Sequence, residues 1–194
     1  MKSMKLILTL TSLLVAGQVM AAEYDVDASH SSVGFKVRHL ISKTPGEFKT
    51  YTGKFSFDEH KPEASSVEFV IKADSINTND QKRDDHLKSA DFFDVTKHPE
   101  ITFKSTKVAK AGKNKFKVTG DFNMHGVTKP VTFDVEYTGT AKDPWGNTKA
   151  GFSANTKINR KDWGIVWNKA MDNGGLVVGD DVEIALLIEA TQKK

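Results

Sequence analysis

The polar side chains best placed to do chemistry lie close together in the middle of the chain. Arg83, Asp84, Asp85 and His86 are consecutive, and a carboxylate beside an imidazole is a combination that enzymes use for acid–base catalysis. The same four residues also suit a solvated helix face with internal ion pairs. We favour the helix face and keep an acid–base centre as the alternative.

Other motifs of catalysis or metal binding are missing from the sequence. The six histidines form no HExxH or other compact ligand pair, although a metal site assembled from distant strands stays open. No GxSxG, glycine-rich phosphate loop or dinucleotide fingerprint occurs, and Gly174-Gly175 is interpreted as a loop before the last strand. The sequence therefore predicts no catalytic residue, no metal and no cofactor.

Composition narrows the class of protein further. The 194 residues include no cysteine, which excludes a disulfide framework, a thiolate zinc site and a lipidated cysteine anchor. The formal net charge is +3, and it falls to +1 without Lys2 and Lys5, which is too small to attract nucleic acid. We therefore expect one domain with no nucleic-acid partner.

The amino terminus has the pattern of a secretory signal peptide. Lys2 and Lys5 precede an apolar run over residues 6–16, and Val19-Met20-Ala21 fits a signal peptidase site. The run is shorter than the roughly 20 apolar residues that a membrane span needs. The sequence predicts a signal peptide over 1–21, a mature chain over 22–194 and no integral membrane anchor.

The mature chain alternates apolar and polar side chains with period two almost throughout. This pattern is typical of strands with one buried face. Without a long amphipathic helix to cover them, eight such strands must bury that face against one another. Short hairpins favour an all-β, eight-stranded, antiparallel up-and-down barrel over a sandwich. The strands are expected at 33–39, 53–57, 67–73, 101–108, 116–124, 131–137, 150–158 and 182–188, with a short edge piece at 24–27.

One long interruption separates these strands. Asp80 is placed to cap one short helix, in which Leu87 is the only large apolar residue, and a loop with Phe92-Phe93 follows. Leu87 and the two phenylalanines offer little apolar surface, so we expect modest anchoring. We predict that residues 78–94 form a lid that opens and closes, and a permanently docked plug is the alternative.

The presumed inner face combines large apolar residues with small ones. Such a wall offers no hydrogen bonds and suits a hydrocarbon chain, whose burial contributes about 0.8 kcal/mol per methylene. A filled barrel, in which small residues accommodate large ones, is equally compatible with the pattern. The candidate ligand-binding residues are Phe35, Val37, Phe55, Phe69, Ile71, Phe92, Phe93, Phe103, Phe122, Phe133, Phe152, Ala154 and Ile184. Arg38, His39, Arg83 and His86 are expected to form a polar mouth that meets a ligand's head group.

The interruption contains the segments TND, RDDHL, SADFFD and HPEITFKS, and the chain continues with GDFNMHGVTKPVTFDVEYTG, DPWGNTKAGFSANTKINRKDWGI and WNKAMDNGGLVVGDDVEI. In these segments the chain resembles the YceI family of bacterial, usually exported, lipocalin-like proteins. Some members hold a long isoprenoid or a similar lipid inside the barrel. The resemblance implies a lipocalin-like, periplasmic, lipid-binding barrel over 22–194 and supplies no catalytic residue.

Two other classes of function remain in competition with lipid binding. A lipid-modifying enzyme would use the same cavity, with Arg83, Asp84 and His86 as its polar centre. A filled barrel would act as a structural or stress-related partner-binding protein. The identity of the lipid stays open, and so does a homodimer formed through an edge strand or the lid.

Overall fold

The computed structural model describes residues 21–58, 60–170 and 176–194. Apart from Ala21, the predicted signal peptide lies outside the described residues, as does the predicted loop at Gly174-Gly175. Among the described helices, none is both long enough and apolar enough to cross a membrane.

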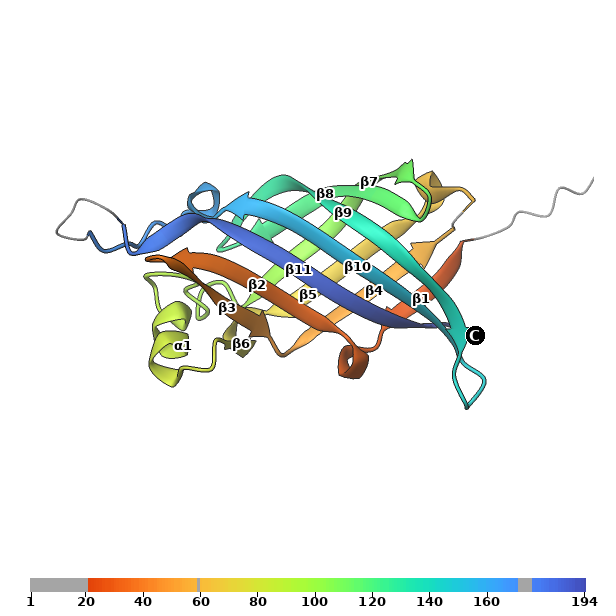
Figure 1. Ribbon diagram of the computed structural model, residues 1–194, viewed down its shortest axis with the longest axis horizontal. Helices are drawn as coiled ribbons and strands as arrows, with labels where there is room; N and C mark the ends of the chain where they lie inside the picture. The colour runs from red at the N-terminus through yellow and green to blue at the C-terminus, as the bar shows by residue number, and fades with distance from the viewer. Residues whose placement is uncertain (1–20, 59, 171–175) are drawn as a thin grey trace, which may run out of the picture.

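The described residues form a closed antiparallel barrel (Figure 1). Eight strands make the ring in the order β1, β4, β5, β7, β8, β9, β10 and β11, and β1 closes it by pairing with both β4 and β11. Their bounds are Ala22–Val26, Tyr51–Phe57, Ser66–Lys72, Glu100–Gly112, Lys115–Met124, Val127–Lys142, Thr148–Asn159 and Val178–Gln192. The all-β, eight-stranded, lipocalin-like fold class is thus confirmed.

Three further strands extend the sheet beyond β11. They are β2 (Ser32–His39), β3 (Ser42–Phe48) and β6 (Ile76–Asn77), which pair in that order. Each of the eight strands expected from the sequence is present, but the expected edge piece at 24–27 was wrong, since it forms β1, which closes the ring, while the expected strand at 33–39 is β2, outside the ring. The sequence analysis missed β3, because Pro45 and Gly46 interrupt its pattern. Proline is tolerated there because β6 pairs only with Glu47 and Phe48, which leaves the rest of β3 as an edge.

Local sequence explains the tight reversals between strands. The turn between β8 and β9 places His125 at φ +51° and Gly126 at φ +74°, and two successive positive φ values are the requirement of a type I′ hairpin turn. Along β8 every second residue is buried, including Phe116, Val118 and Phe122, and the residues between them are exposed or half-buried. This is the period of two that a strand with one buried face requires.

Helix α1 (Gln81–Lys88) lies at one end of the barrel, beside β3 and β6 (Figure 1). As predicted, Asp80 caps it, since its carboxylate accepts a hydrogen bond from the Arg83 backbone N–H at 3.1 Å. Four short 3-10 helices complete the described elements: η1 (Ala28–His30), η2 (Pro62–Ala64), η3 (Ala73–Ser75) and η4 (Arg160–Trp163). The helix therefore covers an end of the barrel and no sheet face.

Candidate functional site: an apolar cavity with one polar end

A cavity of about 430 Å³ lies inside the ring of strands. This volume is within the range of about 300–1,000 Å³ usual for sites that hold one small molecule. All thirteen apolar candidates from the sequence line it: Phe35, Val37, Phe55, Phe69, Ile71, Phe92, Phe93, Phe103, Phe122, Phe133, Phe152, Ala154 and Ile184. Thus the inward face that the alternation predicted encloses a space.

The sequence analysis missed several other residues of the wall. Phe48 lies on the unpredicted strand β3, and Ile165 and Trp167 belong to the segment after η4, where no period-two pattern marks an inner face. Phe116 and Leu186, by contrast, lie on predicted strands and in phase with the inward residues. The alternation alone could have identified those two.

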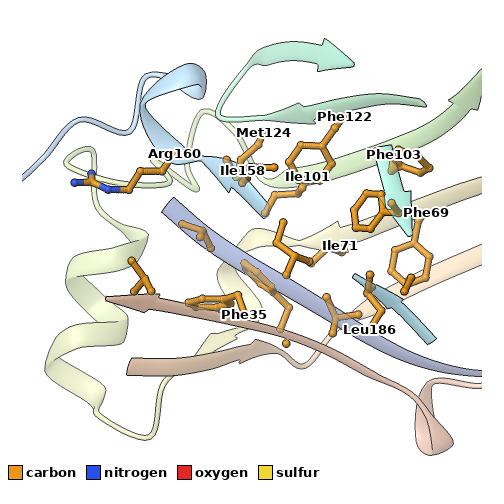
Figure 2. A pocket seen from close by; sticks show the side chains of 18 of the residues that line it. Phe35, Phe69, Ile71, Ile101, Phe103, Phe122, Met124, Ile158, Arg160 and Leu186 are labelled. Carbon is orange, nitrogen blue, oxygen red and sulfur yellow. The ribbon is translucent and has the colours of Figure 1, made fainter. Parts of the chain in front are cut away.

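Most of the polar lining residues gather at the end of the cavity that α1 covers, whereas Ser56 and Ser65 line the opposite end. Those at the α1 end include His39 at the end of β2, Thr78, Arg83 and His86 on or just before α1, and Arg160. Figure 2 shows Arg160 at the α1 end, whereas Phe69 and Phe103 lie further along the barrel. All the ionisable lining residues, His39, Arg83, His86 and Arg160, are at the α1 end, so this end suits the polar head of an amphiphilic ligand.

Arg38 does not share the mouth with the other predicted polar residues. It is exposed and is not among the residues that line the cavity, and its guanidinium donates to the Leu40 carbonyl at 3.0 Å. Because successive side chains of a strand point to opposite faces, Arg38 lies outside where His39 lies inside. The mouth predicted from sequence is corrected on this point.

A buried polar network anchors the start of α1. Asp84 is 7% exposed, and its carboxylate accepts from the Thr78 backbone N–H at 2.8 Å and from the Thr78 hydroxyl at 2.5 Å. Arg83 donates Nε to the same hydroxyl oxygen at 2.7 Å and Nη2 to the Thr78 carbonyl at 2.8 Å. The expectation of anchoring by apolar contacts alone was wrong, since the sequence analysis had treated Asp84 as solvated.

Aromatic contacts hold the loop that follows α1. Phe92 is 7% exposed, and its ring lies 5.0 Å from the His86 ring and 5.1 Å from the Trp167 ring, centroid to centroid. Phe93 packs edge-on against Phe48 of β3. The two phenylalanines thus join the loop to two separate parts of the barrel, and both line the cavity.

Arg160 is a cationic residue of the cavity wall that the sequence analysis did not single out. It is 4% exposed, with Nε donating to the Gly179 carbonyl at 2.9 Å and Nη1 to the Ile165 carbonyl at 2.7 Å. Its Nη2 lies 3.5 Å from Asp180 Oδ1, and within the described chain it makes no hydrogen bond. Burial lowers the pKa of the Arg160 guanidinium, and the charge of Asp180 opposes that shift.

Nothing in the sequence around Arg160 separates it from an ordinary surface charge. It is followed by Lys161, which is exposed and pairs with Asp180 at 2.9 Å. The two neighbours differ because η4 turns the chain inward at the end of β10, so Arg160 and Trp163 are buried while Lys161 is not. An arginine stays protonated at neutral pH even with a lowered pKa, so the cavity wall contains a positive charge.

A closed ring of eight antiparallel strands around an apolar cavity defines a lipocalin-like barrel. The chain belongs to the YceI family, because the family model described as a YceI-like domain matches residues 24–190. A UPF0312 protein of Pseudomonas putida strain GB-1 is 49% identical over 158 residues, which are 80% of this chain and 82% of that protein.

Solved structures show the same architecture. Burkholderia cenocepacia BcnA superposes with a TM-score of 0.77 at 27% identity, over 86% of this chain and 99% of that chain. A polyisoprenoid-binding domain from Saccharophagus degradans superposes with a TM-score of 0.64 at 14% identity, over 89% and 99% respectively. The second likeness concerns the fold alone.

Proposed function

We propose that this protein binds a long-chain isoprenoid or a similar amphiphilic lipid inside its barrel. The observation that carries the proposal is the cavity of about 430 Å³, whose wall is apolar except for Ser56, Ser65 and the polar group at the α1 end. Transfer of a hydrocarbon chain from water into such a wall is favourable by about 0.8 kcal/mol per methylene. The S. degradans neighbour, which is named for polyisoprenoid binding, supports the same ligand class.

The ligand's head group lies at the α1 end in this proposal, with an oxygen atom facing Arg160. Nη2 of Arg160 is a charged donor that lies 3.5 Å from Asp180 Oδ1 but makes no hydrogen bond within the described chain, and leaving a buried donor without a hydrogen bond is costly. A hydroxyl, carbonyl or phosphate oxygen would satisfy it. His39, Arg83 and His86 line the same end and are close enough to the mouth to contact the remainder of the head.

The head-group assignment is tested with paired ligands. Delipidated protein is titrated with an isoprenoid alcohol and with the hydrocarbon of the same length, and we expect the wild type to prefer the alcohol by about tenfold or more. Arg160→Met should remove most of this preference, whereas Arg160→Lys should retain part of it. An unchanged preference in a folded Arg160→Met protein would exclude Arg160 from head-group binding.

The described contacts favour binding over catalysis at the α1 end. The alternative enzyme would use Arg83, Asp84 and His86 as its polar centre. Arg83 and Asp84 are both hydrogen bonded to Thr78, and His86 Nε2 lies 2.9 Å from an Asp91 carboxylate oxygen. Asp84 in particular is buried and fully engaged with Thr78, so it would have to give up these hydrogen bonds to act as a base.

The proposed place of function is the periplasm, which requires removal of residues 1–21. Strand β1 begins at Ala22, so cleavage after Ala21 would leave every described strand intact. Amino-terminal sequencing of protein released by osmotic shock should begin at Ala22. Recovery of only full-length protein in the cytoplasm or the membrane would contradict this proposal.

A further inference from the structure

Two histidines and one aspartate meet at the α1 end of the barrel, and none of the three is among the residues that line the cavity. Asp94 and His98 belong to the loop after α1, and His125 belongs to the turn between β8 and β9. One potential ligand atom from each of the three residues lies within 4.8 Å of the others. The imidazole rings of His98 and His125 are 4.9 Å apart, centroid to centroid.

One ring nitrogen of His125 has a backbone partner of the kind that metal-ligating histidines have. Its Nδ1 lies 3.0 Å from the backbone carbonyl oxygen of Trp163, and because a carbonyl can only accept, Nδ1 carries the proton. The lone pair of the neutral ring is then on Nε2. Metal-ligating histidines are typically held in this way, with the second ring nitrogen donating to a carbonyl or carboxylate.

Asp94 supplies a largely buried carboxylate. Its side chain is 14% exposed, and Lys97 Nζ contacts Oδ2 at 2.8 Å. Lys97 is 72% exposed, so its ion pair is a weak surface contact and involves only one of the two carboxylate oxygens.

The backbone around the cluster is unusually constrained. Asp94 has φ +44° and His125 has φ +51°, and non-glycine residues adopt such angles only where the surroundings enforce them. Gly126 follows at φ +74°, and a Cβ atom there would lie 2.6 Å from Cε1 of His98. Glycine thus permits both the turn and the close approach of the His98 ring.

A second group of the same kind provides a contrast. Asp27, His30 and Glu189 also place potential ligand atoms close together. There, however, Lys149 Nζ lies 2.7 Å from Asp27 and 3.4 Å from Glu189, so a protein cation already occupies the space between the carboxylates. The cluster at Asp94 has only an exposed lysine at its edge.

We propose that Asp94, His98 and His125 bind a Zn²⁺ ion. Two imidazoles and one carboxylate suit zinc and leave a fourth position for water or an external ligand. Tetrahedral ligand atoms at zinc lie roughly 3.3 Å apart, given bonds of about 2.0–2.1 Å, so small side-chain rotations complete the site. The third ligand comes from a separate hairpin, which explains why the sequence showed no compact ligand pair.

Zinc at this position would join the loop after α1 to the barrel. Asp94 directly follows Phe93, while His125 is fixed to the barrel through Trp163, which is 3% exposed and donates its indole N–H to the Phe122 carbonyl at 3.2 Å. Metal bonds from Asp94 on the loop and from His125 on the barrel would hold the loop in its closed position. The zinc site itself does not depend on the proposed lipid function.

The test uses full-length mature protein without a histidine tag, stripped with a chelator and titrated with Zn²⁺ by calorimetry. We expect one zinc per chain, a raised melting temperature, and an absorption spectrum typical of tetrahedral coordination when Co²⁺ is used instead. His98→Ala and His125→Asn should each weaken binding by about tenfold or more. Asparagine is chosen because it tolerates a positive φ.

His30→Ala is the matched control, since it removes a histidine from the other cluster and should leave zinc affinity unchanged. The proposal is overturned if the wild type binds no zinc, which requires no variant to fold. It is equally overturned if folded His98→Ala and His125→Asn proteins bind as tightly as the wild type, or if His30→Ala alone abolishes binding.

Discussion

Filling the cavity from its wall should exclude the lipid without unfolding the barrel. Ala154 lines the cavity on β10, between Val135 of β9 and Leu186 of β11, which line it as well. In Ala154→Phe the new ring would project into the space that the ligand occupies in our proposal. Because the ring enters a cavity and not packed atoms, the cost to stability should be small compared with the usual about 1–3 kcal/mol of overpacking.

The expected loss of affinity follows from the number of ligand carbon atoms that the new phenylalanine ring displaces. Phenylalanine adds six carbon atoms to the alanine side chain, and displacing about six ligand carbons at about 0.8 kcal/mol each forfeits roughly 5 kcal/mol of binding. This corresponds to a loss of between three and four powers of ten in affinity, by the rule of about 1.4 kcal/mol per factor of ten. Only a ligand that shortens or bends its chain would escape the full loss.

The assay compares co-purified lipid per chain, measured by extraction and mass spectrometry, with folding measured by circular dichroism. Asn155→Phe is the matched control, since Asn155 is exposed on the same strand and a ring there leaves the cavity unchanged. We expect an empty Ala154→Phe barrel and a loaded Asn155→Phe barrel. A folded Ala154→Phe protein with its full complement of lipid would refute the placement of the ligand.

Three further predictions concern the lid and the stability of the barrel. Replacing Phe92 and Phe93 together by alanine should speed lipid release if the loop is a gate, whereas a loss of several kcal/mol of stability with unchanged release would identify a plug. The hydrogen bond from Lys149 is the main cause that lowers the pKa of Asp27, so Asp27 stabilises the fold above about pH 4 and this contribution is lost as the pH falls further. Asp27→Asn should therefore cost about 2 kcal/mol at pH 7 and flatten the acid dependence of the urea midpoint, and an unaltered acid profile would count against the pair. Gly120→Ala places a Cβ against a backbone carbonyl of β7 and should cost about 1–3 kcal/mol in urea unfolding; no measurable cost would show that the strands can separate there.

The strands and the inner wall could be predicted because burial of one face of a strand produces an alternation of apolar and polar residues in the sequence. Phe35 and Val37, for example, are two residues apart on β2 and both line the cavity. The same rule shows why Arg38 was misplaced, since it is out of phase with His39. Where the alternation is interrupted, as at Pro45, the strand β3 was not predicted.

The polar parts of the site could not be predicted in this way. Whether a charged residue is buried depends on tertiary partners, and the sequence around Asp84 or Arg160 contains no sign of them. Asp84 is buried because Thr78 supplies two donors, and Arg160 because carbonyls of two separate segments accept from it. Likewise, His98 and His125 meet only through the β8–β9 turn.

The central claim, that the barrel binds a lipid, is tested most directly by native mass spectrometry of the protein purified from its native host. We predict a co-purifying hydrophobic mass, one molecule per chain, which dissociates at raised collision energy and is identified after extraction as an isoprenoid or a comparable amphiphile. An empty barrel that turns over a lipid substrate would indicate an enzyme instead. A barrel that is empty and takes up no isoprenoid when titrated would contradict the claim.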